Sequence, residues 1–130
     1  MINYKTNYPI SVEQFIALLN KTTLGARRPL EDEKRVAAML HHADLLITAW
    51  DGERLVGVAR SVTDFAYCCY LSDLAVDEQY QKQGIGLHLI EYTKQALHPQ
   101  AKIVLLSAPQ AVDYYPHIGF TQHMSAWTKS

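Results

Sequence analysis

Two glycines one residue apart, Gly84 and Gly86, follow the polar run 77–83 and precede a stretch of helical period. The first N–H groups of a helix have no partner inside it, and the helix dipole places partial positive charge there. Because glycine lacks a Cβ atom and adopts positive φ, an anion can approach the backbone closely at such a turn. The turn therefore predicts a phosphate or pyrophosphate site made of the N–H groups from Gln83 to Leu87, with charge added by Lys82.

Two other phosphate-binding motifs fit this stretch poorly. A P-loop requires Gly-Lys-Ser/Thr after its glycines, where this chain has Leu87 and His88. A dinucleotide fingerprint needs a third small residue, and Leu89 stands in its place. On the glycines alone, a tight turn that only allows close helix packing explains Gly84 and Gly86 equally well.

Length and composition limit the class of protein. The chain has 130 residues, 48% hydrophobic and 19% charged, which predicts one folded domain over residues 1–130. A formal net charge of −1 gives no general attraction to nucleic acid. No apolar run approaches the roughly 20 residues of a membrane span, and we expect no signal peptide. The only cysteines, Cys68 and Cys69, lack metal-ligand spacing, so we expect no metal site and a reducing, cytoplasmic location.

Periodicity and turn residues predict a mixed sheet with helices on its faces. The run from Ser11 to Gln14 has the form of a capping box, with Ile10 and Phe15 placed as a hydrophobic staple, and predicts a helix over residues 11–20. The other expected elements are a strand at 2–4, a helix after 31–33, a three-strand antiparallel meander between 45 and 76, a helix at 84–97, a strand at 102–108 buried on both faces, a short helix ending near Gly119 and a last strand at 122–128.

Two motifs, about thirty residues apart, resemble those of the GNAT superfamily of acyl-CoA N-acyltransferases. The run Gln81-Lys82-Gln83-Gly84-Ile85-Gly86 matches the signature Gln/Arg-x-x-Gly-x-Gly/Ala, and YYPHIGF at 114–120 resembles the closing Phe-Tyr-x-x-x-Gly-Phe. The resemblance covers nearly the whole chain, and residues 59–86 further resemble small bacterial members and plant chloroplast relatives that acetylate amines or lysines. It implies a GNAT-like α/β (α+β) fold, with a mixed, mostly antiparallel twisted sheet of six to seven strands flanked by about four helices.

The resemblance implies an N-acetyltransferase that uses acetyl-CoA as co-substrate. The turn at 81–87 would hold the diphosphate, and the peptide-like pantetheine arm would pair with an exposed strand edge. That edge is formed by Leu74, Ala75 and Val76. The family separates this strand from the next, here residues 103–106, and the cofactor fills the gap. Many relatives carry a cofactor-binding asparagine where this chain has Ala108, and Ser107 is the candidate that would substitute for it.

The implied reaction is direct attack of a primary amine on the thioester through a tetrahedral intermediate. The family takes its oxyanion donor from a main-chain N–H of the separated strand, which here corresponds to Leu74. Tyr115 stands at the family's general-acid position beside the cofactor, and its phenol is protonated at neutral pH, while Tyr114 is expected to turn away and pack. Asp73 either takes the ammonium proton or only hydrogen-bonds a bulge, and Asp64 is a weaker candidate for binding the amine.

Acceptor, partners and enzymatic status stay open at this level. Arg27 and Arg28 lie between the first two helices, where they either meet an acidic acceptor or the cofactor phosphates, or are solvated. The acceptor is a small-molecule amine or a protein lysine, and residues 124–128 leave an edge that permits a homodimer. The alternative from another class is a non-catalytic acyl-CoA-binding sensor or interaction module, which would bind CoA without turnover.

Overall fold

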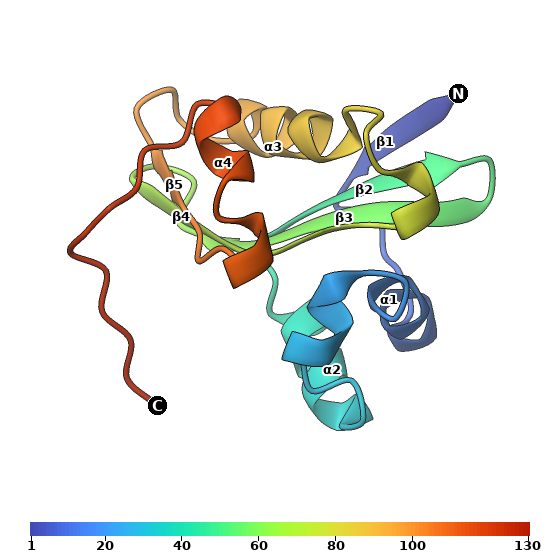
Figure 1. Ribbon diagram of the computed structural model, residues 1–130. Helices are drawn as coiled ribbons and strands as arrows, with labels where there is room; N and C mark the ends of the chain where they lie inside the picture. The colour runs from blue at the N-terminus through green and yellow to red at the C-terminus, as the bar shows by residue number, and fades with distance from the viewer.

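Five strands form one sheet in the sequential order β1-β2-β3-β4-β5, and the computed structural model describes residues 1–130. Neighbouring strands pair antiparallel except β4 and β5, which are parallel. The strands are β1 (Ile2–Thr6), β2 (Leu45–Asp51), β3 (Arg54–Thr63), β4 (Cys68–Val76) and β5 (Lys102–Val104). The sheet is the middle layer of the molecule, with helices on both of its faces (Figure 1).

The chain also forms four α-helices and three short 3-10 helices. The α-helices are α1 (Val12–Leu19), α2 (Glu33–His41), α3 (Ile85–Gln95) and α4 (Tyr114–His117), and the 3-10 helices are η1 (Thr23–Arg27), η2 (Glu78–Tyr80) and η3 (Pro109–Ala111). The predicted capping box of α1 is present, with the Ser11 side chain accepting from the Gln14 N–H and the Gln14 side chain accepting from the Ser11 N–H. None of the helices combines the length and apolar character needed to cross a membrane.

Two hydrophobic cores lie on opposite faces of the sheet. One core joins the sheet to α3 and includes the fully buried Ile47 and Leu89. The other joins the sheet to α1 and α2 and includes Phe15 and Val36. Each core is supplied by one face of the same strands, because successive side chains of a strand point to opposite faces.

A bulge in β4 changes which side chains face each core. Arg60 of β3 is opposite Asp73, and the next residue, Ser61, is opposite Leu71, so Ser72 is left without a partner. Before the bulge, Leu71 belongs to the α3-side core; after it, Leu74 and Val76 pack against that core. One extra residue therefore reverses the alternation of the strand just where it leaves its neighbour β5.

The same bulge carries a buried ion-pair cluster. The Asp73 side chain is 0% exposed, and its Oδ1 lies 2.6 Å from Nε of Arg28, which comes from the loop before α2. Its Oδ2 accepts a hydrogen bond from Nε of Arg60, on β3. Arg60 also donates to the Ser72 hydroxyl and to the main-chain oxygen of Met39. The cluster ties β3, β4 and the α1–α2 layer together at one point.

The carboxyl-terminal part of the chain departs from the sequence prediction. The sheet has five strands rather than six to seven, because residues 122–128 form no strand and their Trp127 is 91% exposed. The strand expected over 102–108 ends at Val104, which is 44% exposed, so it is not buried on both faces. An apolar run shows that side chains favour burial, but only a neighbouring strand or layer provides it.

We expect Asp73→Asn to lower the free energy of unfolding by about 3–5 kcal/mol, because it leaves two arginines around a neutral side chain in a buried site. Urea unfolding of wild type and variant measures the difference. The matched control is Asp113→Asn, whose carboxylate is exposed and makes no capping hydrogen bond. A loss of less than about 1 kcal/mol, in the range of surface ion pairs, would contradict a structural role for Asp73.

Candidate functional site

The parallel strands β4 and β5 separate after three residue pairs and leave one edge of β4 open. Their pairing ends with Tyr70 opposite Val104, so residues 71–76 have no strand beside them on that side. The N–H of Asp77 donates to the Val56 oxygen at 2.8 Å. Because main-chain groups alternate in direction along an antiparallel strand, the N–H groups of Leu74 and Val76 point to the open edge. Residues 74–76 of β4 and the chain after Val104 thus separate, as the sequence predicted for 74–76 and 103–106, although β5 itself ends at Val104.

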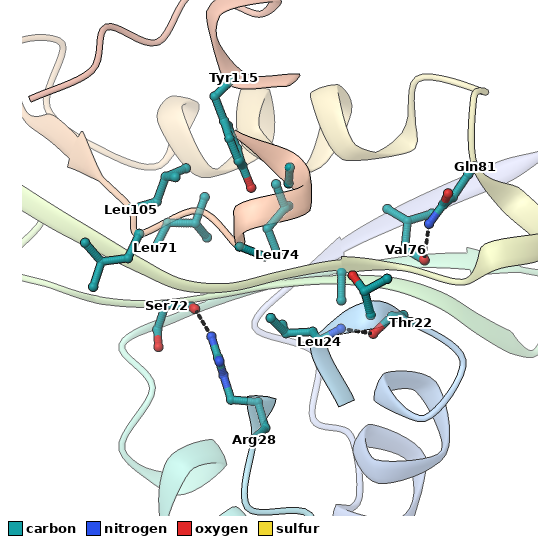
Figure 2. A pocket seen from close by; sticks show the side chains of 15 residues that line it. Thr22, Leu24, Arg28, Leu71, Ser72, Leu74, Val76, Gln81, Leu105 and Tyr115 are labelled. Atoms are coloured by element: carbon teal, nitrogen blue, oxygen red, sulfur yellow. Dashed lines mark hydrogen bonds between the residues drawn. The ribbon is translucent and has the colours of Figure 1, made fainter. Parts of the chain in front are cut away.

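A cleft follows this open edge, between the α3 and α4 side of the sheet and the η1 side (Figure 2). Ten of the fifteen residues that line it are hydrophobic. They are Leu71, Ser72, Leu74, Ala75 and Val76 of β4; Thr22, Thr23, Leu24 and Arg28 of the α1–α2 connection; Gln81 of the turn; and Leu105, Leu106, Ala108, Ala111 and Tyr115 of the carboxyl-terminal part. The cleft therefore combines an apolar wall with unused main-chain hydrogen-bonding groups.

The glycine turn lies beyond the Val76 end of the cleft and presents free N–H groups. None of the main-chain N–H groups from Gln83 to Leu87 donates a hydrogen bond within the protein. Gly84, the N-cap of α3, has φ 80°, and Lys82 has φ 64°, both in the left-handed region. Residues with positive φ here alternate with a residue of ordinary negative φ. This alternation of backbone conformation turns successive N–H groups toward a common point and makes an anion-binding concavity.

Polar contacts that sequence reasoning missed hold the first half of this loop. Asp77 is buried, and its carboxylate accepts from the Gln79 N–H at 2.9 Å and from Arg54 of the β2–β3 hairpin at 3.0 Å. Tyr80 donates its hydroxyl proton to the Asp51 carboxylate on the same hairpin. The loop is thereby fixed to the sheet, which leaves its second half free to face a ligand. An aspartate directly after a strand and a tyrosine three residues later were the only signals available in the sequence.

Tyr115, the predicted general acid, points its hydroxyl toward β4 at Leu74 from the opposite wall of the cleft (Figure 2). Its ring packs edge-on against Tyr114 and Phe120, with centroids 5.3 Å and 5.5 Å away. Burial, and to a lesser degree the neighbouring Tyr114, raises the pKa of its phenol above the ordinary value of a tyrosine. The side chain is therefore protonated at neutral pH and faces the open edge of β4.

Tyr114 does not line the cleft, in agreement with the sequence prediction, but it packs on α3 and stays partly exposed. Its side chain is 41% exposed, and its hydroxyl oxygen lies over the first turn of α3. A Cβ atom added to Gly86 would lie 3.1 Å from that oxygen. The close approach gives Gly86 a packing role as well as its place in the anion turn.

The two carboxylates considered for amine chemistry do not line the cleft. Asp73 faces away from it, toward Arg28 and Arg60, which favours the interpretation that it supports the bulge. Asp64 accepts main-chain hydrogen bonds from residues 66–68 and closes the β3–β4 turn. Those bonds, that of Tyr67 first, lower the pKa of its carboxyl. No cleft-lining side chain is a carboxylic acid, so the structure offers no direct base there.

The remaining candidates divide between cleft and surface. Gln81 lines the cleft and lies 3.5 Å from the Val76 oxygen, whereas Lys82 is exposed at the tip of the turn. Ser107 does not line the cleft, although its neighbour Ala108 does, and its cofactor contact stays a prediction. Arg28 lines the cleft, contrary to a solvated loop, while the Arg27 side chain is exposed. No three His, Cys, Asp or Glu residues are grouped to hold a metal ion.

An anion turn, an open strand edge and a protonated phenol around one apolar cleft suit a long, phosphorylated, peptide-like acyl carrier. The family model of the GNAT acetyltransferase domain matches residues 23–129. GCN5-related N-acetyltransferase 2, chloroplastic, of Arabidopsis thaliana is 38% identical over 77 residues, and histone acetyltransferase TAP1 of Glycine max is 37% identical over 70 residues. The matches cover 54% and 52% of this chain but only 30% of either plant protein.

A solved bacterial structure has the same architecture over its whole length. A GNAT-family acetyltransferase from Streptococcus pneumoniae superposes with a TM-score of 0.76 and 25% identity, covering 99% of this chain and 98% of that protein. The shared fold agrees with the mixed sheet and flanking helices predicted from the sequence. The motif at the turn, the separated strands and the match over residues 23–129 place this chain in the GNAT acetyltransferase family.

Proposed function

We propose that this protein transfers the acetyl group of acetyl-CoA to the primary amine of a small molecule or a protein lysine. The single observation that carries the proposal is the row of unpaired N–H groups at 83–87, which lies beyond the Val76 end of the cleft that the unpaired N–H groups of Leu74 and Val76 face. A diphosphate fits the first set, and a peptide-like arm fits the second. Acetyl-CoA joins both kinds of group in one molecule and supplies an acetyl thioester.

Each part of the site has a separate role in the proposed reaction. The turn N–H groups hold the diphosphate, and Val76 and Leu74 pair with the amide groups of the arm. The Leu74 N–H stabilises the negative charge that develops on the carbonyl oxygen. As the amine nitrogen bonds to the acetyl carbon and the carbon–sulfur bond breaks, Tyr115 gives its proton to the departing sulfur. The amine proton leaves to water, and Tyr115 is reprotonated from water, since no carboxylate lines the cleft.

A non-catalytic CoA-binding module is the second candidate. It would use the same turn and edge but would need no acid at Tyr115. The position of the phenol opposite Leu74 favours an enzyme. Cytoplasmic location, a single-domain protein, a homodimer and the absence of nucleic-acid or membrane partners stay predictions.

Gly84→Ala is expected to weaken acetyl-CoA binding about tenfold, measured as Kd by titration calorimetry. Alanine at φ 80° is strained by about 1–2 kcal/mol, and relaxation of that strain turns the N–H groups away from the diphosphate. Gly52→Ala is the matched control, because Gly52 has φ 61° in the β2–β3 turn and lines no part of the cleft. Equal Kd values for wild type and Gly84→Ala would argue against the anion turn.

Tyr115→Phe is expected to lower kcat about 100-fold and to leave the Kd for acetyl-CoA nearly unchanged, because only the proton donor is removed. Release of CoA thiol with a panel of primary amines measures kcat. Tyr67→Phe, an exposed tyrosine of the β3–β4 turn, is the control and should keep wild-type activity. Binding of CoA by wild type with no thiol release on any amine would favour the module instead.

The pH dependence of kcat should rise from neutral pH as the acceptor ammonium loses its proton, and the fall caused by loss of the Tyr115 proton should come at a higher pH than for a free phenol. The sign follows from the pKa of Tyr115, which burial raises, so that the acid form persists to higher pH. Initial rates of thiol release, corrected for hydrolysis without amine, give the profile. A descending limb that vanishes in Tyr115→Phe but lies at lower pH than the titration of a free phenol would contradict the raised pKa.

A further inference from the structure

The cleft has two ends, and the turn at 83–87 determines which end receives the acceptor. With the diphosphate at the turn, the arm runs along Val76 toward Leu74, so the thioester lies opposite Tyr115 (Figure 2). The cleft continues past this point toward the junction of β4 and β5. Ser72, Arg28 and the leucines 71, 105 and 106 line that remaining end. Whatever attacks the thioester therefore lies among these residues.

Arg28 is the only charged side chain among the residues that line the cleft. It belongs to a cluster with two arginines and one aspartate, so the cluster carries a net charge of about +1. A purely cationic acceptor is repelled by this wall, whereas an acceptor that carries a negative charge is attracted to it. The apolar surroundings of the cleft end strengthen both effects, because they reduce screening.

The guanidinium of Arg28 is fixed in position and still has free donors. Its Nε donates to the Asp73 carboxylate at 2.6 Å. One Nη donates to the main-chain oxygen of Ser72 at 2.7 Å, and the other Nη donates to the main-chain oxygen of Arg27 at 2.9 Å. A guanidinium has five N–H groups, so two remain for a ligand. The side chain is 19% exposed, on the cleft side of the loop. Little rotamer entropy is lost when such an arginine binds a carboxylate.

The spacing along β4 sets the size of the ligand. Ser72, which Arg28 contacts, precedes Leu74 by two residues, a rise of about 6–7 Å in a regular strand and less across a bulge. An amine that attacks beside Leu74 and a carboxylate bound by Arg28 therefore belong to one small molecule, in which few carbon atoms separate the two groups. The leucines at the same end provide an apolar surface for a side chain.

We infer that Arg28 is a carboxylate-binding residue and that the acceptor is an amino acid with an apolar side chain, in which few carbon atoms separate the amine from the carboxylate. The inference rests on the proposed acetyl transfer and specifies its substrate class. Arg28 orients the acceptor through its carboxylate, so that the amine nitrogen faces the acetyl carbon. The same residue discriminates against polyamines and against amines that lack an acid group.

Matched pairs of acceptors test this inference: phenylalanine against phenethylamine, and leucine against 3-methylbutylamine, each differing only by the carboxylate. The quantity measured is kcat/KM for thiol release, and its ratio within each pair is compared between wild type and variants. The pKa of the amine differs between the two acceptors of a pair, but it is the same whichever enzyme variant is used. Comparing the ratio between variants therefore measures only the effect of the substitution in the protein. Arg28→Gln should lower the ratio about 100-fold, and Arg28→Lys should lower it less. Arg27→Gln, whose side chain is exposed, should leave it unchanged.

Two measurements separate a binding role from a structural one. Thermal unfolding and the Kd for acetyl-CoA are determined for each variant, since Arg28 also pairs with Asp73. Equal losses of kcat/KM on both members of each pair overturn the inference. Turnover of only the carboxylate-free amines also overturns it, while the proposed acetyl transfer stands.

A direct titration covers the case in which no amine is acetylated. That result defeats the proposed function, and phenylalanine is then titrated into the CoA-saturated protein by calorimetry. Binding that is lost in Arg28→Gln and kept in Arg27→Gln supports the carboxylate site on its own. Absence of binding to wild type overturns the site as well.

Discussion

The open edge of β4 is the constraint on which the rest of this molecule depends. A buried strand normally satisfies its N–H and C=O groups with neighbours on both sides. Here the bulge at Ser72 and the end of β5 at Val104 leave Leu74 and Val76 with main-chain groups that no other strand can reach. Unsatisfied main-chain groups beside apolar side chains are unfavourable unless water or a ligand pairs with them. An edge of this kind is a template for an extended ligand with amide groups of its own.

The glycine turn extends this edge by the same physical means. Like β4, it offers main-chain donors without partners, but it directs several of them to one point and adds the dipole of α3. The contacts of Asp77 with Arg54 and of Tyr80 with Asp51 hold the loop to the β2–β3 hairpin. The binding surface is therefore pre-formed on the sheet, and substitutions at the backbone-defining glycines should affect it more than exchanges of exposed side chains.

The one charged side chain that lines the cleft, Arg28, is held by a buried ion-pair cluster. Asp73 forms ion pairs with two arginines, Arg28 and Arg60, and it stabilises the bulge rather than facing the cleft. Its carboxylate thus fixes the position of Arg28, and Arg28 gives the proposed acceptor end of the cleft a positive charge. In the proposed reaction, a cleft without a carboxylate and with a phenol whose pKa is raised by burial would give a proton to sulfur rather than take one from an ammonium. Under that proposal, acceptors with a weakly basic amine would suit the site best.

Local signals in the sequence determined the elements and the place of the turn. Some residues shape only the few residues next to them in the chain: the capping residues around Ser11, Gly52 in its hairpin, and Gly84 and Gly86 in the turn. The local structure at these places could therefore be predicted before any tertiary contact was known. The closing motif likewise located Tyr115. What only the tertiary structure decided depends on partners distant in the chain: the shortness of β5, the absence of a last strand, the hydroxyl of Tyr114 over Gly86, and the pairing of Asp73 with Arg28, 45 residues away. The sequence contained both residues of that ion pair, but whether a carboxylate serves as base or as counter-ion depends on which side chains lie within a few ångströms of it, and the fold alone sets those distances.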